Sequence, residues 1–314
     1  MGSVKDVVIK EEPTANKSGK GVFIFSDRYS VFDYGEMPDL IEGKGKSLCM
    51  ISAYFFERLE EENIKNHYLG VVENGKVKRL EEVQEPSNLM QTKIVRVLKP
   101  EKTDGYDYSI FRKEKSNFLI PLEVIYRNTL PEGSSIFRRL ERGEISLEQL
   151  GLTSPPSPGE ILKKPLLDVS TKLESEDRYL SWDEAMKISG LSEDELEKLK
   201  EITLHVNKII TESTEKAGIK NEDGKLEFAF DAEREMMVVD AVGTPDECRF
   251  SFDGIQISKE VLRKYYRRTE WYTMIEKLKG NERWREEAGR PPKLSEELRN
   301  AVSSMYKACC NEIT

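Results

Sequence analysis

Residues 223–250, DGKLEFAFDAEREMMVVDAVGTPDECRF, are the stretch that most constrains how this chain can fold. Lys225, Glu227 and Phe228 belong to an alternating run, residues 231–233 predict a turn, and residues 236–239 form an apolar segment of strand length. This order predicts an antiparallel β-hairpin. Its second strand ends in Asp240, and a charge at the end of an apolar strand is costly unless it is paired.

The charged residues of this hairpin suggest a metal site. Side chains alternate across a strand, so Lys225 and Glu227 are expected on one face, and an antiparallel return brings Asp240 next to Glu227. Two facing carboxylates repel each other, and Mg²⁺ relieves this repulsion while leaving coordination positions for substrate phosphates. The pattern therefore predicts a metal–nucleotide site with Lys225 beside it. From spacing alone, a solvated hairpin with ordinary surface charges explains it equally well.

Composition limits the class of protein. A chain of 314 residues can form one large or two medium domains. No apolar run approaches the ~20 residues of a membrane span, the N-terminus lacks a signal-peptide core, and we expect no membrane partner. A net charge of −9 without a long block of one sign argues against a nucleic-acid partner. Four cysteines, including the adjacent Cys309 and Cys310 expected as thiols on the last helix, fit a cytoplasmic protein.

The first third of the chain predicts strands around one helix. A hairpin is expected from the segment SVKDVVI and the strand Val22 to Phe25, and a turn at Asn74-Gly75 joins strands within residues 68–97. Ser47 to Leu59 has the spacing of a core-facing helix. The preceding GKGK run is either an anion-binding turn, because glycines let backbone amides approach an anion, or a flexible solvated loop.

The remaining segments predict further strands and helices. Residues 99–117 are expected to form a charged loop, and Phe118 to Tyr126 an apolar strand that delivers Arg127 to the next loop. An arginine at a strand end suits a bidentate grip on a carboxylate or phosphate, although a surface ion pair is equally compatible. Ser192 and Glu195 form a capping box that begins a long helix.

Taken together, these segments resemble one family, the SAICAR synthetases (phosphoribosylaminoimidazole-succinocarboxamide synthases) of purine biosynthesis. The resemblance runs nearly from end to end, and its motifs occur in the family's order. They are SVKDV, SDRYSVFD, GKGKSL, Asn66-His67, IPLEVIYRN with the later GSS, STK with Asp177, DGKLEF, VVD with TPDECRF, SKEVLR, and PPKLSEEL with VSSMY.

The resemblance implies a fold and a reaction. The fold would be α+β and ATP-grasp-like, with an N-terminal antiparallel β domain (residues 1–97) that covers the nucleotide and a larger α+β catalytic domain (residues 98–314) with C-terminal helices. ATP would activate the carboxylate of carboxyaminoimidazole ribonucleotide, and L-aspartate would attack it to give SAICAR, ADP and phosphate. The implied cofactors are ATP and Mg²⁺, and a homo-oligomer is compatible with the family.

The resemblance also implies roles for individual residues. Glu227 and Asp240 would ligate Mg²⁺, and Lys225 would touch the transferred phosphoryl group or the activated carboxylate. Catalytic roles are thus expected for Lys225, Asp240 and Arg249. The expected contacts to ATP are Lys5, Asp6, Met90, Lys225, Glu227 and Asp240. The expected contacts to the substrates are Asp33, Lys44, Lys46, Arg127, Ser134, Ser135, Lys172, Asp177, Asp246, Arg249, Lys259 and Arg263.

Six positions depart from the family's pattern. They are Ser3 in place of lysine, Glu176 in place of histidine, Ala229 in place of glycine, Ala241 in place of glutamate, and Glu247 and Cys248 in place of serines. A negative Glu247 beside Arg249 would disfavour one of the anions that the family binds. Two alternatives therefore stay open: a ligase for another carboxylate and amine, and a nucleotide-binding paralogue without turnover.

Overall fold

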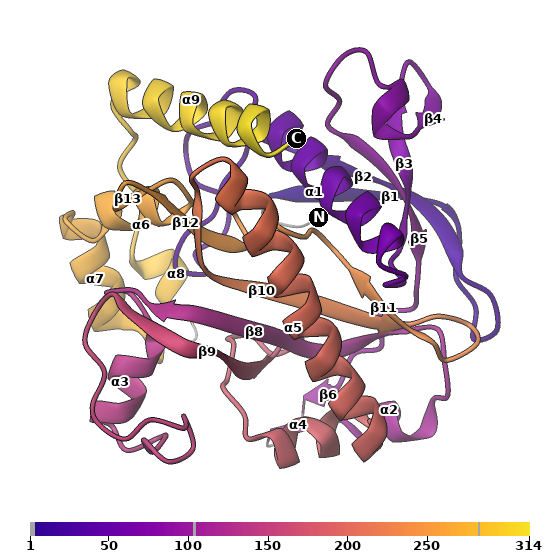
Figure 1. Cartoon of the computed structure of the whole chain (residues 1–314). Coiled ribbons are helices and arrows are strands. Elements are labelled where there is room, and N and C mark those ends of the chain that lie inside the picture. Colours follow the sequence, from indigo (N-terminus) through magenta and orange to yellow (C-terminus); the bar gives the residue numbers. More distant parts are fainter. Residues whose placement is uncertain (1–3, 103–104, 282) are drawn as a thin grey trace.

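The N-terminal part of the chain forms a five-stranded antiparallel sheet (Figure 1). The computed structural model describes residues 4–102, 105–281 and 283–314. In spatial order the strands of this sheet are β1 (Lys5–Glu11), β2 (Gly19–Phe25), β5 (Leu89–Ile94), β3 (Tyr68–Glu73) and β4 (Lys76–Lys78). The expected first hairpin and the Asn74-Gly75 turn are confirmed, and both turn residues have positive φ, 50° and 77°, as a two-residue hairpin loop requires.

A second antiparallel sheet carries most of the expected site residues. Its order is β13 (Ile255–Gln256), β12 (Cys248–Phe252), β10 (Lys220–Phe230), β8 (Phe118–Leu130) and β9 (Glu160–Thr171), and β11 (Met236–Val239) also pairs with β10. The first half of β10 pairs with β12 and its second half with β11, so the predicted hairpin is confirmed. The long helix α5 (Glu193–Lys216) packs on β8 and β10 and covers one face of this sheet (Figure 1).

Helices and short elements complete the fold. They are α1 (Lys44–Glu61), η1 (Leu80–Glu82), β6 (Glu101–Lys102), β7 (Tyr106–Asp107), α2 (Ser109–Lys113), α3 (Ser135–Glu141), α4 (Trp182–Ser189), α6 (Glu260–Tyr266), α7 (Glu270–Leu278), α8 (Trp284–Glu287) and α9 (Glu296–Ile313). The capping box of Ser192 and Glu195 begins α5 as predicted. Among the described residues, no helix has both the length and the apolar character needed to cross a bilayer.

Two boundaries differ from the sequence-based expectation. β8 continues to Leu130, so Arg127 lies inside the strand and not in the loop after it, because β9 and β10 pair with this strand on both sides. The charged segment 99–117 is not one loop, since it contains β6, β7 and α2.

The GKGK run is the start of α1 and not a flexible loop. Helix α1 begins at Lys44, three residues before the expected start. The backbone amides of Gly43 and Gly45 donate to the carboxylate of Asp27 at 3.2 and 2.9 Å. The anion at this turn is therefore a side chain of the same protein, which satisfies amides that a helix start leaves without partners.

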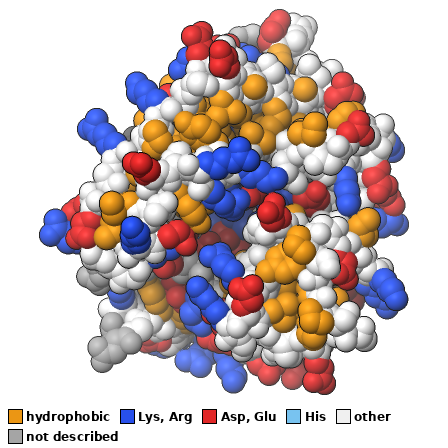
Figure 2. Space-filling view, turned by 90° about the vertical axis from the view of Figure 1, so that its left-hand side faces the viewer, with side chains coloured by type: hydrophobic (Ala, Val, Ile, Leu, Met, Phe, Trp, Pro, Cys, Tyr) orange, Lys and Arg blue, Asp and Glu red, His pale blue; other side chains and the backbone are white. Residues whose placement is uncertain are grey.

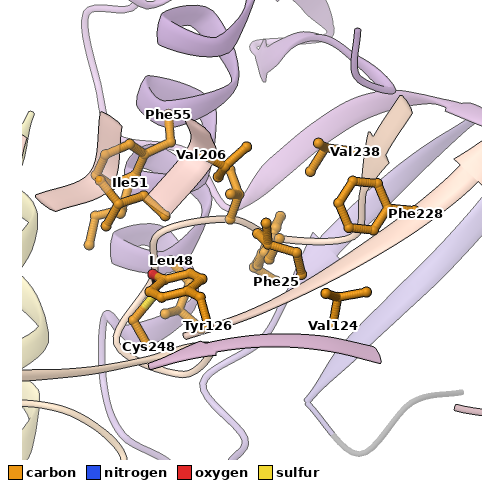
Figure 3. Packing of buried hydrophobic residues seen from close by; sticks show 14 of the residues in the cluster. Phe25, Leu48, Ile51, Phe55, Val124, Tyr126, Val206, Phe228, Val238 and Cys248 are labelled. Atoms are coloured by element: carbon orange, nitrogen blue, oxygen red, sulfur yellow. Dashed lines mark hydrogen bonds between the residues drawn. The ribbon is translucent and has the colours of Figure 1, made fainter. Parts of the chain in front are cut away.

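One apolar core joins the two sheets (Figure 3). Phe25 of β2, Phe55 of α1, Tyr126 of β8 and Phe228 of β10 belong to the same buried cluster. The backbone also connects the sheets, because residues 65–67 bond to Val238 of β11 on the side opposite β10. Strand β11 thus brings residues of the second sheet against the N-terminal sheet.

Candidate active site

The β10–β11 hairpin places two acids at the junction of the sheets. Glu227 pairs with Val239 in the strand register, so Asp240 follows directly and lies beside Glu227. Asp240 has φ of 71°, a left-handed conformation that aspartate tolerates better than most residues. Glu227 is buried, with 4% of its surface exposed. The juxtaposition expected from the alternating pattern is therefore present.

A second acid faces Glu227 from the neighbouring strand. Glu123 of β8 lies opposite Glu227 in the register, and lysines bridge the two carboxylates. Lys172, just beyond β9, lies 2.6 Å from Glu227 and 3.3 Å from Glu123. Lys225 lies 2.7 Å from Glu123 and 3.5 Å from Glu227. The four side chains form a compact cluster in which positive and negative groups alternate.

The N-terminal strand contributes a lysine to the same place. Lys5 of β1 forms an ion pair with Asp240, and its ammonium group lies 4.5 Å from the centre of the Phe23 ring. The ring of His67 contacts the backbone oxygen of Asp240 through Nε2 at 3.2 Å. Asp240 is thus held by groups from the N-terminal sheet although it belongs to the second sheet.

The pKa values of the two acids diverge. Burial, together with the nearby charge of Asp240, raises the pKa of Glu227 to about 7. Burial alone would also raise the pKa of Asp240, but Lys5, Lys172 and Lys225 outweigh it and hold that pKa well below its usual range. Such a split is typical of two neighbouring carboxylates in unequal surroundings.

A polar cavity of about 270 Å³ opens beside this cluster. The face of the molecule that carries α6 and α3 in Figure 1 is turned toward the viewer in Figure 2, where Lys and Arg side chains gather around a hollow. Among the residues expected from the sequence, those lining the cavity are Asp33, Arg127, Asp177, Lys225, Asp246, Arg249, Lys259 and Arg263. Most of the expected substrate contacts therefore converge on one cavity.

A row of charges crosses three strands at the wall of this cavity. Asp223 of β10 lies opposite Arg127 on one side and Arg249 on the other, at 3.5 and 3.2 Å. Arg127 is 2% exposed and also reaches Asp168 of β9 at 3.3 Å. Both acidic partners of Arg127 are buried. The alternative expectation, that Arg127 forms an ion pair at the surface, is therefore excluded.

Helix α6 completes the wall of this cavity, and α3 begins next to Arg127 and lines the larger neighbouring space. Ser134 caps α3, and Ser135 receives a hydrogen bond from Arg127 at 3.2 Å. Lys259, just before α6, has no carboxylate within 4.0 Å among the described residues, and burial lowers its pKa. Arg263 pairs with Glu260 at 3.2 Å. Lys259 is thus a cation without a close acidic partner in the described part of the cavity.

Four expected contacts lie elsewhere. Lys44 is fully buried, 2.7 Å from Asp246, so the expected direct contact with substrate is replaced by a contact with a cavity residue. Lys46 is exposed and lines a separate groove of about 740 Å³ together with Asp6, which pairs with Arg28 at 2.8 Å. Met90 is fully buried within the N-terminal sheet.

The cavity continues into a larger one of about 1390 Å³. Asp33 and Asp177 line both spaces, and Asp33 has φ of 57°, which places it in the left-handed region. Burial and the charges of Glu123 and Asp33 raise the pKa of Asp177 to about 6. Glu176 lines only the larger space.

The residues that differ from the family pattern lie in different surroundings. Glu247 lies 3.3 Å from Lys225, whereas Arg249 is paired with Asp223. The thiol of Cys248 is buried and lies 3.3 Å from the hydroxyl of Tyr126. Ala229 and Ala241 are buried, and Ser3 lies outside the described residues.

Three buried acids of the site carry no role predicted from the sequence. These are Glu123, Asp168 and Asp223, which all pair with cations of the site. The signal for Glu123 and Asp168 was a charge inside an apolar strand, in IPLEVIY and LLDV.

Fold and site together define a class of protein: a mixed α+β protein with lysines, arginines and acids clustered beside a polar cavity. Side chains of this kind suit phosphate and carboxylate ligands. The family model described as SAICAR synthetase matches residues 2–278. A provisionally named phosphoribosylaminoimidazole-succinocarboxamide synthase of Archaeoglobus fulgidus is 60% identical over 100% of this chain and 93% of its own length. The enzyme of that name from Thermoplasma acidophilum is 35% identical over 93% of this chain and 92% of its own.

Solved structures show the same fold. A type-2 SAICAR synthetase in complex with ADP aligns over 94% of this chain and 99% of its own, with a TM-score of 0.61 and 24% identity. The Saccharomyces cerevisiae SAICAR synthase complexed with SAICAR covers 100% of this chain and 93% of its own, with a TM-score of 0.66 and 21% identity. The chain belongs to the SAICAR synthetase family, the ATP-dependent ligases that join carboxyaminoimidazole ribonucleotide and aspartate in purine biosynthesis.

Proposed function

We propose that the family's reaction takes place where the β10–β11 hairpin meets β1, with Lys225, Glu227 and Asp240 at the ATP phosphates. The observation that carries this proposal is the pair of Glu227 and Asp240, which is surrounded by lysines from three separate strands or strand ends. The adjacent cavity lined by Arg127, Arg249 and Lys259 would hold the ribonucleotide. The sites proposed for the ATP phosphates and for the ribonucleotide would then lie next to each other.

The donor set fits a Mg²⁺ ion. Glu227 and Asp240 are two carboxylates side by side, and the charge of Asp240 adds to burial in raising the pKa of Glu227. No group of three or more potential ligands is present in the described residues, yet Mg²⁺ in nucleotide sites uses one or two carboxylates and substrate phosphates. When bound, the ion would neutralise charge on the transferred phosphoryl group.

The nucleotide would lie between the two sheets, as in an ATP-grasp-like arrangement. Lys5 of β1 already reaches Asp240 across this junction, so the N-terminal sheet is placed to cover the phosphates. The relative solved with ADP supports nucleotide binding by this fold. We assign residues 1–97 to the covering domain and residues 98–314 to the catalytic domain. The contact of Met90 with adenine stays a prediction, although its side chain is fully buried in this structure.

The cavity wall suits an anionic ribonucleotide. Arg249 is half-buried and reaches the oxygen of Gly133 at 3.4 Å, next to Ser134 and Ser135 at the start of α3. Backbone amides at a helix start and arginines bind phosphate oxygens well. Lys259 adds a cation without a carboxylate within 4.0 Å among the described residues. The ribose phosphate and the carboxylates of the substrates would be held by these groups.

The chemistry demands dense positive charge. A carboxylate resists attack by an amine because it is already anionic, and phosphorylation by ATP supplies both an electrophile and a leaving group. Lys225 would hold the transferred group, while Lys5 and Lys172 screen the acids around it. Preorganised charges of this kind usually supply the largest part of catalysis.

A coupled ADP-release assay tests the function. Turnover should require carboxyaminoimidazole ribonucleotide, aspartate and Mg²⁺ together. ATP binding without turnover would favour the non-catalytic paralogue, and turnover with another acid and amine would favour the divergent ligase. Glu247 gives no reason for another substrate, because it pairs with Lys225 and leaves Arg249 to Asp223.

A further inference from the structure

The C-terminal helix α9 reaches a residue of the polar cavity. Tyr306 of α9 donates a hydrogen bond from its hydroxyl to Oδ1 of Asp246 at 2.6 Å. Asp246 lies in the loop before β12 and lines the cavity. The helix belongs to residues 296–313, beyond the part of the chain that the family model matches. A segment beyond the match to the family model therefore contacts the cavity that we assign to the ribonucleotide.

Asp246 is held at both oxygens. Oδ2 lies 2.7 Å from the ammonium of Lys44, at the start of α1, and Oδ1 accepts from Tyr306. The side chains of Asp246 and Lys44 are 4% and 0% exposed, and Tyr306 is fully buried. Because both the ion-pair partner and the hydrogen-bond donor are buried, they hold the carboxylate in one orientation.

This orientation matters for Lys259. The backbone amide of Lys259 donates to the oxygen of Pro245 at 3.0 Å, so its backbone is tied to the loop that carries Asp246. The charges of Asp246 and Lys259 influence each other, yet no ion pair within 4.0 Å forms between them. Tyr306 and Lys44 thus hold a carboxylate whose charge acts on a cation of the cavity.

We propose that Tyr306 is a positioning residue for the ribonucleotide site: its hydroxyl fixes Asp246 against Lys44 and so leaves Lys259 available to an anion of the substrate. The proposal rests on the assignment of the cavity to the ribonucleotide. Loss of the hydroxyl leaves Oδ1 of Asp246 without its donor, and the carboxylate turns toward Lys259. Binding of an anionic substrate then weakens, while the phosphoryl-transfer groups around Lys225 stay in place.

The test compares Tyr306→Phe with a matched control on the same helix. Ser303→Ala removes a hydrogen bond of the same length, 2.6 Å, from α9 to the backbone oxygen of Glu42, without touching Asp246. Tyr306→Phe should raise KM for carboxyaminoimidazole ribonucleotide about tenfold, the loss expected for a hydrogen bond to a charged group, with kcat and KM for ATP near those of the wild type. Ser303→Ala should leave all three constants unchanged.

A merely structural role predicts a different result. Equal kinetic effects of the two substitutions, or a wild-type KM in Tyr306→Phe, would overturn the proposal. The effect should also disappear when Asp246→Asn is already present, because the hydroxyl acts through that carboxylate. Additive effects of the two changes would contradict this route.

A second measurement does not depend on turnover. Acetic anhydride labels neutral amines, and peptide mass spectrometry reports the rate at Lys259. In Tyr306→Phe the labelling should slow several-fold, since an ion pair with Asp246 keeps the amine protonated, and Ser303→Ala should label like the wild type. Unchanged labelling in Tyr306→Phe would overturn the positioning role even in an inactive chain. A wild type without turnover would instead refute the proposed function alone.

Discussion

Glu123 of β8 and Glu227 of β10 lie directly opposite each other in the strand register, and Lys172 and Lys225 bridge them. Like charges facing each other across strands are destabilising. Two buried acids in this position therefore depend on the lysines, and the lysines depend on the acids. The cluster is a unit in which the loss of one member changes the others.

Glu123→Gln should destabilise the protein and slow the reaction. Lys225 and Lys172 would lose a buried partner, and breaking such a pair costs about 3 kcal/mol. Both lysines would then move toward Glu227 and compete with the metal ion. Urea unfolding and the ADP-release assay measure the two effects. Glu184→Gln removes a surface partner of Arg178 and should change neither.

Asp240→Asn should lower kcat by at least about a hundredfold with little loss of stability, because the expected metal ligand loses its charge. Asparagine tolerates the left-handed conformation of this position, with φ of 71°. Asp253→Asn is the matched control, since Asp253 is exposed and also has positive φ, 46°. Wild-type turnover in Asp240→Asn would refute the metal assignment.

Arg249→Ala should mainly weaken ribonucleotide binding. Loss of charge-assisted hydrogen bonds to a phosphate or carboxylate predicts a rise in KM of about tenfold or more. Asp223 keeps Arg127 as a partner, so the wall of the cavity should persist. Arg58→Ala, which removes a surface pair with Glu61, serves as the control in the same steady-state assay. An unchanged KM would remove Arg249 from the site.

Glu247→Ser restores the residue type expected at this position in the family. The cavity loses a negative charge, while Lys225 keeps Glu123 and Glu227 as partners. The KM for the anionic ribonucleotide should fall by about threefold, the size of effect expected for one partly exposed charge. Glu235→Ser, at an exposed acid paired with Lys198, controls for the general change in net charge. A higher KM would show that Glu247 supports binding.

His67 should make stability depend on pH. Burial lowers its pKa from 6.5 to about 3, so between these values the unfolded chain binds a proton that the folded protein excludes. Stability should therefore be fully present above pH 6.5 and fall as the pH decreases, by at most about 1.4 kcal/mol per pH unit.

The two histidines allow a matched comparison of this effect. Urea unfolding between pH 4 and 7 should show a smaller slope in His67→Gln than in the wild type. His205→Gln should keep the wild-type slope, because His205 is exposed on α5 near Glu62. Equal slopes in all three proteins would contradict the role of His67.

Much of the local structure could be predicted from the sequence. The β10–β11 hairpin, the Asn74-Gly75 turn and the capping box before α5 all formed as expected. Each depends on residues within a few positions of one another, where side-chain alternation, turn conformation and capping act directly on the backbone. Because the two strands of the hairpin follow each other directly in the chain, the sequence also predicted that Asp240 lies next to Glu227.

Only the tertiary structure decided how distant segments complete the site. The alternating pattern around Glu227 could not show that Glu123 lies opposite it, that Lys5 reaches Asp240, or that Tyr306 holds Asp246. These pairs follow from strand order and from helices packing on a core shared by both sheets. The sequence determined which groups the hairpin carries, while long-range packing decided which charges meet them, because register and packing depend on the whole buried core.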